Sequence, residues 1–245
     1  FKVSWIKQMR PTQGKEIQGY FIVLPLLPQQ LRELGEGFVL DKIIAAGYMA
    51  ERLDARILGL GGYFSLLVEK GLNVSGKLKI PVTSGSTFTA WSVIEAIYRM
   101  SKAKNIDLEK SILAVIGATS SIGSLCARKL SDYVTKIIIT ASHRDKLEHL
   151  KESILYQNSI EVILEEDNHK AAKEADIIIY ATDLAQAVIN IEELKPHAIV
   201  CDVSVSKDIA AKVNRRRDIT IINGSLIKLP FPISFGINTG LSKDM

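Results

Sequence analysis

The stretch SILAVIGATSSIGSLCARKLSDYVTKIIITASHR, residues 111–144, decides the fold that the sequence predicts. Ile112–Ile116 is an apolar run of the length typical of a buried parallel strand, and Lys136–Thr140 repeats that pattern. Between these runs lie a turn that contains two glycines and a helical pattern over residues 124–130. Strand, turn, helix and strand in this order predict the first half of a dinucleotide-binding unit.

The alternation of strands and helices continues after residue 144. Four further apolar runs have the length of buried strands, and helical patterns over residues 145–155 and 169–175 lie between them. Strands that alternate with helices predict a parallel sheet with right-handed crossovers. Six runs in total predict a doubly wound α/β domain of the Rossmann type. The four further runs are residues 159–164, 177–181, 199–203 and 219–222.

The first 104 residues show weaker strand and helix patterns, because glycine and proline interrupt them. The clearest helix is predicted over residues 89–104, where apolar residues recur at helical spacing. We expect residues 1–104 to form a smaller N-terminal α/β substrate domain and residues 105–245 to form the dinucleotide-binding Rossmann domain. The other elements expected in the first domain are strands over residues 15–24, 55–59 and 78–82 and a helix over residues 29–52.

The composition excludes several classes of protein. The formal net charge of +4 is too small for the concentrated basic face of a nucleic-acid binder. No apolar run approaches the roughly 18 residues that a membrane-spanning helix needs. The two cysteines provide no disulfide framework and are typical of a reducing compartment, so we expect a cytoplasmic protein. The four histidines lack the spacing of metal ligands, and no metal site is expected.

The turn between the first two strands is a variant of the dinucleotide-binding fingerprint. Gly117 stands where the chain turns out of the strand, and Gly123 stands where the next helix must pack close to the sheet. Ser120 replaces the usual middle glycine, and the hydroxyl groups around it are expected to bind phosphate at the helix N-terminus. The alternative is a degenerate turn that binds nothing. The predicted cofactor-binding residues of this turn are Gly117, Ala118, Thr119, Ser120, Ser121, Ile122 and Gly123.

The end of the second strand distinguishes between the two nicotinamide cofactors. A free ribose 2′-hydroxyl usually meets an acidic residue about 20 residues beyond the glycines. Here the strand leads into Ser142, His143 and Arg144, which offer hydrogen-bond donors to a 2′-phosphate. The competing acid, Asp145, is better placed to begin the next helix. The sequence therefore predicts NADP(H) as the cofactor.

Ala181 and Thr182 follow the fourth strand of the predicted sheet. Ligands of doubly wound domains bind at the carboxyl ends of the strands, so we expect both residues beside the cofactor. The alternative for this segment is an ordinary turn, in which small and polar residues are common.

Two turns of the first domain combine small residues with hydroxyl groups just before a helix. They are GLGGYFS at residues 59–65 and TSGST at residues 83–87. This combination suits the binding of a polar substrate group. Helix capping and turn chemistry alone would favour the same residue types.

Seven segments together resemble a known family, and they occur in the family's order. The chain resembles the long-chain acyl–acyl-carrier-protein reductases, which form fatty aldehydes, and their bacterial relatives labelled predicted amino acid dehydrogenases. It is similar, more distantly, to shikimate dehydrogenases and glutamyl-tRNA reductases, which share the two-domain plan. The resemblance covers nearly the whole chain and rests on GKEIQGYFIVLPLLP, LGLGGYFSLL, TSGSTFTAW, VIGATSSIGSLCARKL, ASHRDKL, LKPHAIVCDVS and IINGS.

The resemblance implies an NADPH-dependent oxidoreductase that reduces an acyl thioester, such as one on acyl carrier protein, to a fatty aldehyde. In the family a cysteine accepts the acyl group, and it follows the segment that matches residues 231–244. Neither Cys126 nor Cys201 matches that position, so we expect this nucleophile beyond the chain and assign no catalytic residue. The implied substrate-binding residues are Gly61, Gly62, Ser65, Thr83, Ser84, Gly85 and Ser86.

Two alternatives from other functional classes stay open. A dehydrogenase of a small hydroxy or amino acid, of the shikimate type, would need a Lys–Asp acid–base pair, and the sequence shows no convincing one. A non-catalytic module would bind NADP and regulate a partner protein. The sequence also leaves the oligomeric state open, with a homo-oligomer among the alternatives.

Overall fold

The computed structural model of the chain describes residues 2–9, 14, 16–27, 30, 33–62, 64, 71–182, 189–204, 209 and 216–228. The chain divides into two compact units, residues 1–85 with 226–245 and residues 86–225. The expected domain boundary was residue 104, whereas the units divide before α5 (Ser86–Ala103). The reason is that Ala90, Val93 and Ile97 of this helix are buried in the core of the second unit.

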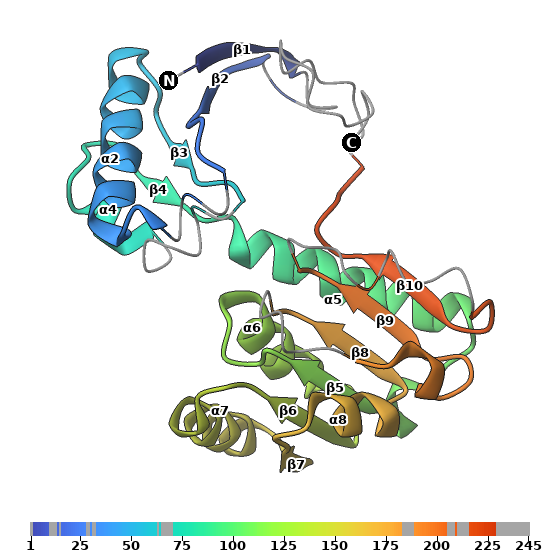
Figure 1. The fold of residues 1–245 in the computed structure, drawn as a ribbon. Coiled ribbons are helices and arrows are strands. Elements are labelled where there is room, and N and C mark those ends of the chain that lie inside the picture. Colours follow the sequence, from blue (N-terminus) through green and yellow to red (C-terminus); the bar gives the residue numbers. More distant parts are fainter. Residues whose placement is uncertain are drawn as a thin grey trace. The chain divides into compact units, whose positions relative to one another are not determined.

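A six-stranded sheet forms the second unit, and every strand pair that the structure describes in it is parallel (Figure 1). The spatial order is β7-β6-β5-β8-β9-β10. This is the order of a doubly wound dinucleotide-binding domain, with the switch point between β5 and β8. The predicted α/β fold class is therefore confirmed. The strands are β5 (Ile112–Ile116), β6 (Lys136–Thr140), β7 (Glu161–Leu164), β8 (Ile177–Tyr180), β9 (Ile199–Asp202) and β10 (Thr220–Asn223).

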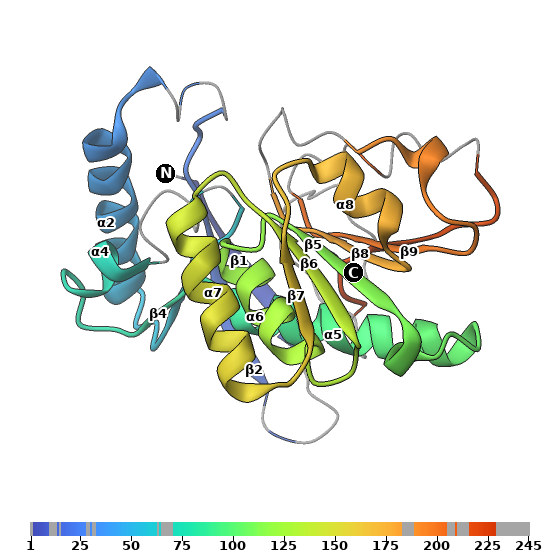
Figure 2. The ribbon, with the colours of Figure 1, turned by 90° about the horizontal axis from the view of Figure 1, so that it is seen from below.

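Helices cover both faces of this sheet because its strands are apolar on both faces. On one face lie α5, α6 (Ser121–Leu130) and α7 (Arg144–Gln157), which pack on alternate strand residues such as Val115 and Ile139 (Figure 2). On the other face lies α8 (Asn168–Glu174), which packs on the strand residues whose side chains point in the opposite direction. Two short 3-10 helices, η2 (Leu108–Lys110) and η3 (Ile191–Glu193), lie in connections.

The first unit is built from two separate two-stranded sheets. β1 (Lys2–Met9) pairs with β2 (Ile17–Val23) in the antiparallel sense, and β3 (Leu58–Gly59) pairs with β4 (Val82–Thr83) in the parallel sense. The helices are α2 (Glu36–Arg52) and α4 (Leu72–Ser75). The helix expected over residues 29–52 is interrupted at Gly35, whose φ of 76° a helix cannot contain. Gln30 and Glu33 before this glycine are helical, and α2 begins after it at Glu36. β1 had no counterpart among the predicted elements.

The buried core of the first unit is small. Its described cluster is Val39, Ile43, Leu60 and Val74, and Ala46 and Ala50 are buried as well. The clusters of the second unit contain many more buried side chains on either face of the sheet. None of the helices in the described ranges is long and apolar enough to cross a membrane.

Candidate functional site

The carboxyl edge of the six-stranded sheet brings the last residues of its strands into one register row. Ile116 lies between Thr140 and Tyr180, and Tyr180 is followed by Asp202 and then Asn223. The glycine turn leaves the sheet directly after Ile116. Ligands of doubly wound domains bind along this edge, so the row defines the candidate site.

Gly117 is required by the geometry of the turn. Its φ of 78° lies in the left-handed region, which residues other than glycine adopt at a cost. A Cβ atom at this position would lie 2.5 Å from the carbonyl oxygen of Ala181 and 2.9 Å from the Cβ atom of Thr182. The structure therefore brings Ala181 and Thr182, both predicted from the sequence, against the start of the glycine turn.

The N-terminus of α6 has the donors that a phosphate group needs. Ser120 caps the helix, since its Oγ accepts a hydrogen bond of 3.0 Å from the amide of Gly123. Gly123 is also a close contact, because a Cβ there would meet the carbonyl oxygen of Gly117. The amides of Thr119, Ser121 and Ile122 donate no hydrogen bond within the described part of the chain. Free amides at a helix N-terminus favour an anion.

The capping role of Ser120 refines the sequence-based expectation for its hydroxyl group. The oxygen accepts the hydrogen bond of the cap, and the hydroxyl hydrogen stays available to donate to a phosphate. The helix begins at Ser121, three residues before the expected start, because this cap fixes its first turn. Ala118 is fully buried and its amide donates to the carbonyl oxygen of Thr140, so this residue anchors the turn to β6.

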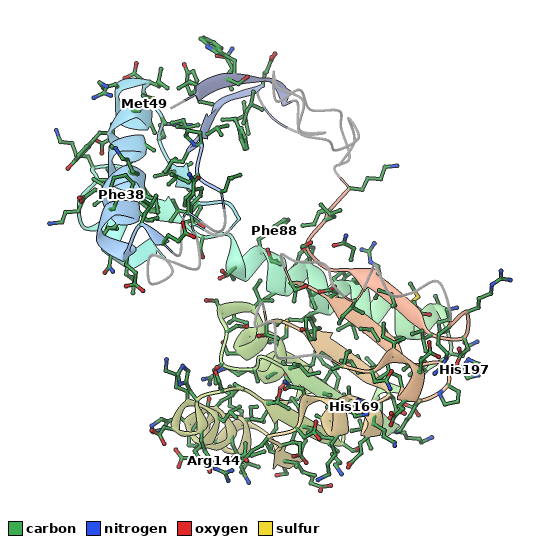
Figure 3. The ribbon with its side chains drawn as sticks, in the orientation of Figure 1. Phe38, Met49, Phe88, Arg144, His169 and His197 are labelled. Atoms are coloured by element: carbon green, nitrogen blue, oxygen red, sulfur yellow. The ribbon has the colours of Figure 1, made fainter. Side chains whose placement is uncertain are left out.

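Arg144 begins α7 and lies at the far side of the same edge (Figure 3). Its guanidinium group contacts two carboxylates, with 2.7 Å from Nη1 to Oε1 of Glu166 and 3.4 Å from Nε to Oε1 of Glu148. The side chain is 60% exposed, and Ser142 and His143 are also exposed. The three residues are therefore accessible to a ligand, but a 2′-phosphate would have to share Arg144 with Glu166.

Asp202 is a residue of this edge that the sequence analysis missed. Its Oδ1 accepts hydrogen bonds from the amide of Ser204 (2.9 Å) and from the Oγ of Ser204 (2.6 Å). Its Oδ2 is buried and has no hydrogen-bond partner in the described structure, and the residue is 3% exposed. The signal in the sequence was a carboxylate inside the apolar run of residues 199–203.

The described cysteines and histidines form no reactive centre. Burial raises the pKa of Cys126 to about 12 and, helped by the nearby Asp202, that of Cys201 to about 12 as well. Thiols with such values are protonated at neutral pH and poor nucleophiles. No group of three potential metal ligands occurs in the described residues. His169 and His197, labelled in Figure 3, lie on α8 and before β9 and do not approach each other there.

In the first unit, the turn after β3 lines a cavity of about 1060 Å³. The walls come from β2, from α2 and from residues 53–62, and they are mostly apolar, with Ile43, Ala46 and Phe64 among them. Gly61 and Gly62 lie on its wall, as does Arg56. Ser65, predicted with them, lies outside the described residues. A cavity of this size and character can hold an extended apolar ligand.

The second predicted turn, which begins at Thr83, follows from β4. The register of β3 and β4 places Gly59 beside Thr83, and the amide of Leu60 donates to the carbonyl oxygen of Thr83 (2.8 Å). The two turns therefore leave the same edge of this small sheet. Thr83 Oγ1 accepts from the amide of Gly85 (3.2 Å), while Ser84 precedes this glycine and Ser86 begins α5.

Among the described ion pairs, one Lys–Asp pair joins residues that are far apart in the sequence. It lies at the opposite, amino edge of the large sheet. Lys195 Nζ lies 2.8 Å from Oδ1 of Asp176, and Oδ2 of Asp176 accepts from the amide of Ile112 (2.8 Å). Both residues precede strands, so the pair lies at the end remote from the glycine turn. It therefore cannot serve as an acid–base pair for a ligand at the carboxyl edge.

Comparison with known proteins identifies a matching family and two similar proteins. Residues 99–224, just over half of the chain, match the family described as shikimate/quinate 5-dehydrogenase. A long-chain acyl-[acyl-carrier-protein] reductase of Synechococcus elongatus is 26% identical over 235 residues, which is 91% of this chain and 67% of the reductase. The aminotransferase PigE of Serratia is 25% identical over 229 residues, 91% of this chain but only 26% of PigE.

Solved structures resemble the chain more weakly. L-Tryptophan dehydrogenase from Nostoc punctiforme is 16% identical, with a TM-score of 0.47, and the match covers 76% of this chain and 55% of that enzyme. The fold assignment therefore rests on the strand order and register of the large sheet.

Proposed function

The chain belongs to the shikimate/quinate 5-dehydrogenase family, and from this premise we propose that it binds NADPH at the carboxyl edge of its large sheet to reduce an acyl thioester. Membership of this family makes the chain an NAD(P)-dependent oxidoreductase. The observation that carries the thioester is the match to the acyl-carrier-protein reductase over 91% of this chain. The product of the proposed reaction is an aldehyde together with the free carrier thiol.

The residues present at the carboxyl edge fit a dinucleotide. The amides of Thr119, Ser121 and Ile122 have hydrogen-bonding capacity to spare, as a pyrophosphate requires. Gly117 and Gly123 keep this surface free of side chains, so the backbone can approach the ligand. We infer that Ser142, His143 and Arg144 bind the 2′-phosphate, and that Ala181 and Thr182 flank the path of the cofactor towards its nicotinamide end.

In this proposal the protein supplies binding and orientation. NADPH supplies the hydride when it is bound, and reduction of the thioester also consumes one proton. The α6 N-terminus fixes the pyrophosphate, and Arg144 fixes the 2′-phosphate by charge-assisted hydrogen bonds. Fixing both ends of the adenosine half leaves the nicotinamide half to be oriented by the segments that follow β8 and β9.

The cavity of the first unit supports a long acyl chain as substrate. Burial of an acyl chain against its apolar walls would stabilise the complex by about 25 cal/mol for each Å² of aliphatic surface removed from water. A long chain buries more surface than a short one, so this cavity favours a long chain. Gly61 and Gly62 on its wall leave room beside the chain. We propose Gly61, Gly62, Ser65, Thr83, Ser84, Gly85 and Ser86 as the substrate-binding residues, with the hydroxyl groups near the polar end of the substrate.

The acyl-accepting group of this proposal is not one of the two cysteines of the chain. Both thiols are buried, and the raised pKa of each leaves no useful fraction of thiolate at neutral pH. We propose that the accepting group is the cysteine that follows, in the reductases, the segment matching residues 231–244.

The test measures aldehyde formation by the natural protein with NADPH and palmitoyl–acyl carrier protein. We expect one aldehyde for each NADPH oxidised, and slower turnover with NADH at equal concentration. No aldehyde in the presence of saturating NADPH would contradict the proposed substrate class.

A second candidate function is the oxidation of shikimate, quinate or an amino acid with NADP⁺, and the family match favours it. Against it, the described Lys–Asp pair between elements lies at the amino edge, away from the glycine turn. Reduction of NADP⁺ by one of these acids, without aldehyde formation from the thioester, would establish this candidate. Tight binding of NADPH with neither activity would instead indicate a regulatory module.

A further inference from the structure

The free oxygen of Asp202 is left unexplained by the proposed roles of the other residues. The carboxylate lies at the end of β9, in the register row that also contains Tyr180 of β8. One oxygen is satisfied by Ser204, and the other has no partner in the described structure although the residue is 3% exposed. A buried polar atom without a partner is costly and needs a reason.

The neighbouring strand carries the same turn with an amide in place of the carboxylate. Asn223 pairs with Asp202 in the register of β10 and β9. Its Oδ1 accepts from the amide of Ser225 (3.2 Å) and from the Oγ of Ser225 (2.8 Å), as Asp202 does from Ser204. An asparagine side chain is therefore sufficient for this turn, and the second oxygen of Asp202 is not needed to build it.

The chemistry of that oxygen restricts its partner. An ionised carboxylate only accepts hydrogen bonds, so the missing partner must be an N–H or O–H donor. The phosphate groups of a dinucleotide accept hydrogen bonds and carry negative charge, so they would repel Asp202. The nicotinamide nucleoside half offers two kinds of donor, the carboxamide NH₂ group and the ribose hydroxyl groups.

The topology places Asp202 on the appropriate half of the sheet. The glycine turn leaves β5, on one side of the switch point, and Asp202 ends β9, the middle strand of the other half. Each half of a doubly wound domain binds one mononucleotide of the ligand. If the adenosine half lies over β5 and β6, as Arg144 indicates, the nicotinamide half lies towards β8 and β9.

We propose that Asp202 is a cofactor-binding residue, whose Oδ2 accepts a hydrogen bond from the nicotinamide nucleoside half of NADPH. The assignment rests on the proposed cofactor site and deepens it. It also gives the free oxygen a partner that is present only when the cofactor is bound.

The experiment compares Asp202→Asn with the wild type in the binding of three ligands, measured by calorimetry without any substrate. NADPH contains the whole cofactor, 2′-phospho-ADP-ribose lacks the nicotinamide ring, and 2′,5′-ADP lacks the whole nicotinamide nucleoside. We expect the variant to bind NADPH about 10- to 100-fold more weakly and 2′,5′-ADP with unchanged affinity. An equally large loss for 2′-phospho-ADP-ribose would identify a ribose hydroxyl as the donor, and no loss would identify the carboxamide.

Two binding results would overturn the assignment. Equal losses for all three ligands would show a general disturbance of the edge, and unchanged binding of NADPH would show that the oxygen has no role in the complex. If the wild type itself fails to bind NADPH, the proposed cofactor is wrong and the assignment falls with it.

Thermal unfolding of the unliganded variant is the second readout. The Asp202→Asn change removes a buried, half-paired charge and keeps the turn, so we expect an unchanged or higher melting temperature and a smaller upward shift with NADPH. A clearly lower melting temperature with unchanged affinity would mean a structural role. The matched control is Asp176→Asn at the amino edge, which we expect to lower the melting temperature and leave the affinity for NADPH unchanged.

Discussion

Asp176 and Asp202 show how differently the two ends of one sheet are built. At the amino edge both carboxylate oxygens of Asp176 are used, by the amide of Ile112 and by Lys195. The backbone of Asp176 also donates to the carbonyl of Ile112 and accepts from the amide of Ile199. At the carboxyl edge one oxygen of Asp202 has no partner in the described structure.

The difference extends beyond the two carboxylates. The free amides of Thr119, Ser121 and Ile122 lie at the same edge as the free oxygen of Asp202. One edge thus satisfies its polar groups internally and holds three strands together, whereas the other leaves donors and an acceptor for a ligand. The comparison predicts that substitutions at the first edge reduce stability and that those at the second edge mainly reduce binding.

The largest effect is expected at Gly117, where structure and binding coincide. Gly117→Ala places a Cβ atom 2.5 Å from the carbonyl oxygen of Ala181 and imposes a left-handed φ on alanine. We expect a loss of about 3 kcal/mol or more in the free energy of unfolding, measured in urea. The control is Gly61→Ala, where nothing lies within 4 Å of the new atom, with an expected change within about 0.5 kcal/mol.

Arg144→Ala tests the binding side of the comparison. Loss of the guanidinium group removes the charge-assisted contact with the 2′-phosphate, so we expect NADPH to bind about 10- to 100-fold more weakly and NADH to bind as before. Fluorescence titration of both cofactors measures the effect. Arg99→Ala, at an exposed arginine of α5 paired with Glu95, should change neither affinity. Equal weakening of both cofactors by Arg144→Ala would refute this role.

Asp176→Ala tests the structural side. The amide of Ile112 and the ammonium group of Lys195 lose their acceptor, so we expect the free energy of unfolding to fall by about 1–3 kcal/mol. Denaturant unfolding measures this loss, and titration should show an unchanged affinity for NADPH. A weaker affinity without a loss of stability would contradict the division between the two edges.

Glu166→Gln should strengthen NADPH binding, by a smaller factor than Arg144→Ala weakens it. Glu166 now pairs with Arg144 at 2.7 Å and would compete with the 2′-phosphate. Because an exposed ion pair contributes up to about 1 kcal/mol, we expect NADPH to bind up to about fivefold more tightly. Glu152→Gln, at an exposed glutamate of α7 that pairs with His149, provides the control. The gain should diminish at high salt, since exposed charges are screened.

The smallest effect is expected for the reactivity of Cys126 and Cys201, which are buried in the core between the two edges. Burial raises the pKa of both thiols to about 12, so about one thiol in ten thousand is ionised at pH 8. The folded protein should therefore show no rapid reaction with a thiol reagent, and the unfolded protein should show two reactive thiols. Rapid modification of the folded chain would contradict the absence of a nucleophile in these residues.

The strands of the large sheet could be predicted closely from the sequence. Ile112–Ile116 and Lys136–Thr140 have the predicted bounds, because strands buried on both faces appear as uninterrupted apolar runs. Predicted helices were less accurate, since the cap at Ser120 moves the start of α6 by three residues and Gly35, with a positive φ, interrupts the helix expected over residues 29–52. The first unit was predicted least well, because its core is small, no residue of β2 is buried, and β3 and β4 contain two residues each.

The sequence by itself determined the doubly wound sheet and the glycine turn, because hydrophobic period and glycine spacing are local properties of the chain. The tertiary structure alone decided which polar groups are left over at the edge. Whether Arg144 meets Glu166, and whether an oxygen of Asp202 finds a partner, depends on residues that are brought together from separate parts of the chain. Hydrogen-bond satisfaction is a property of neighbours in space, and the sequence does not contain it locally.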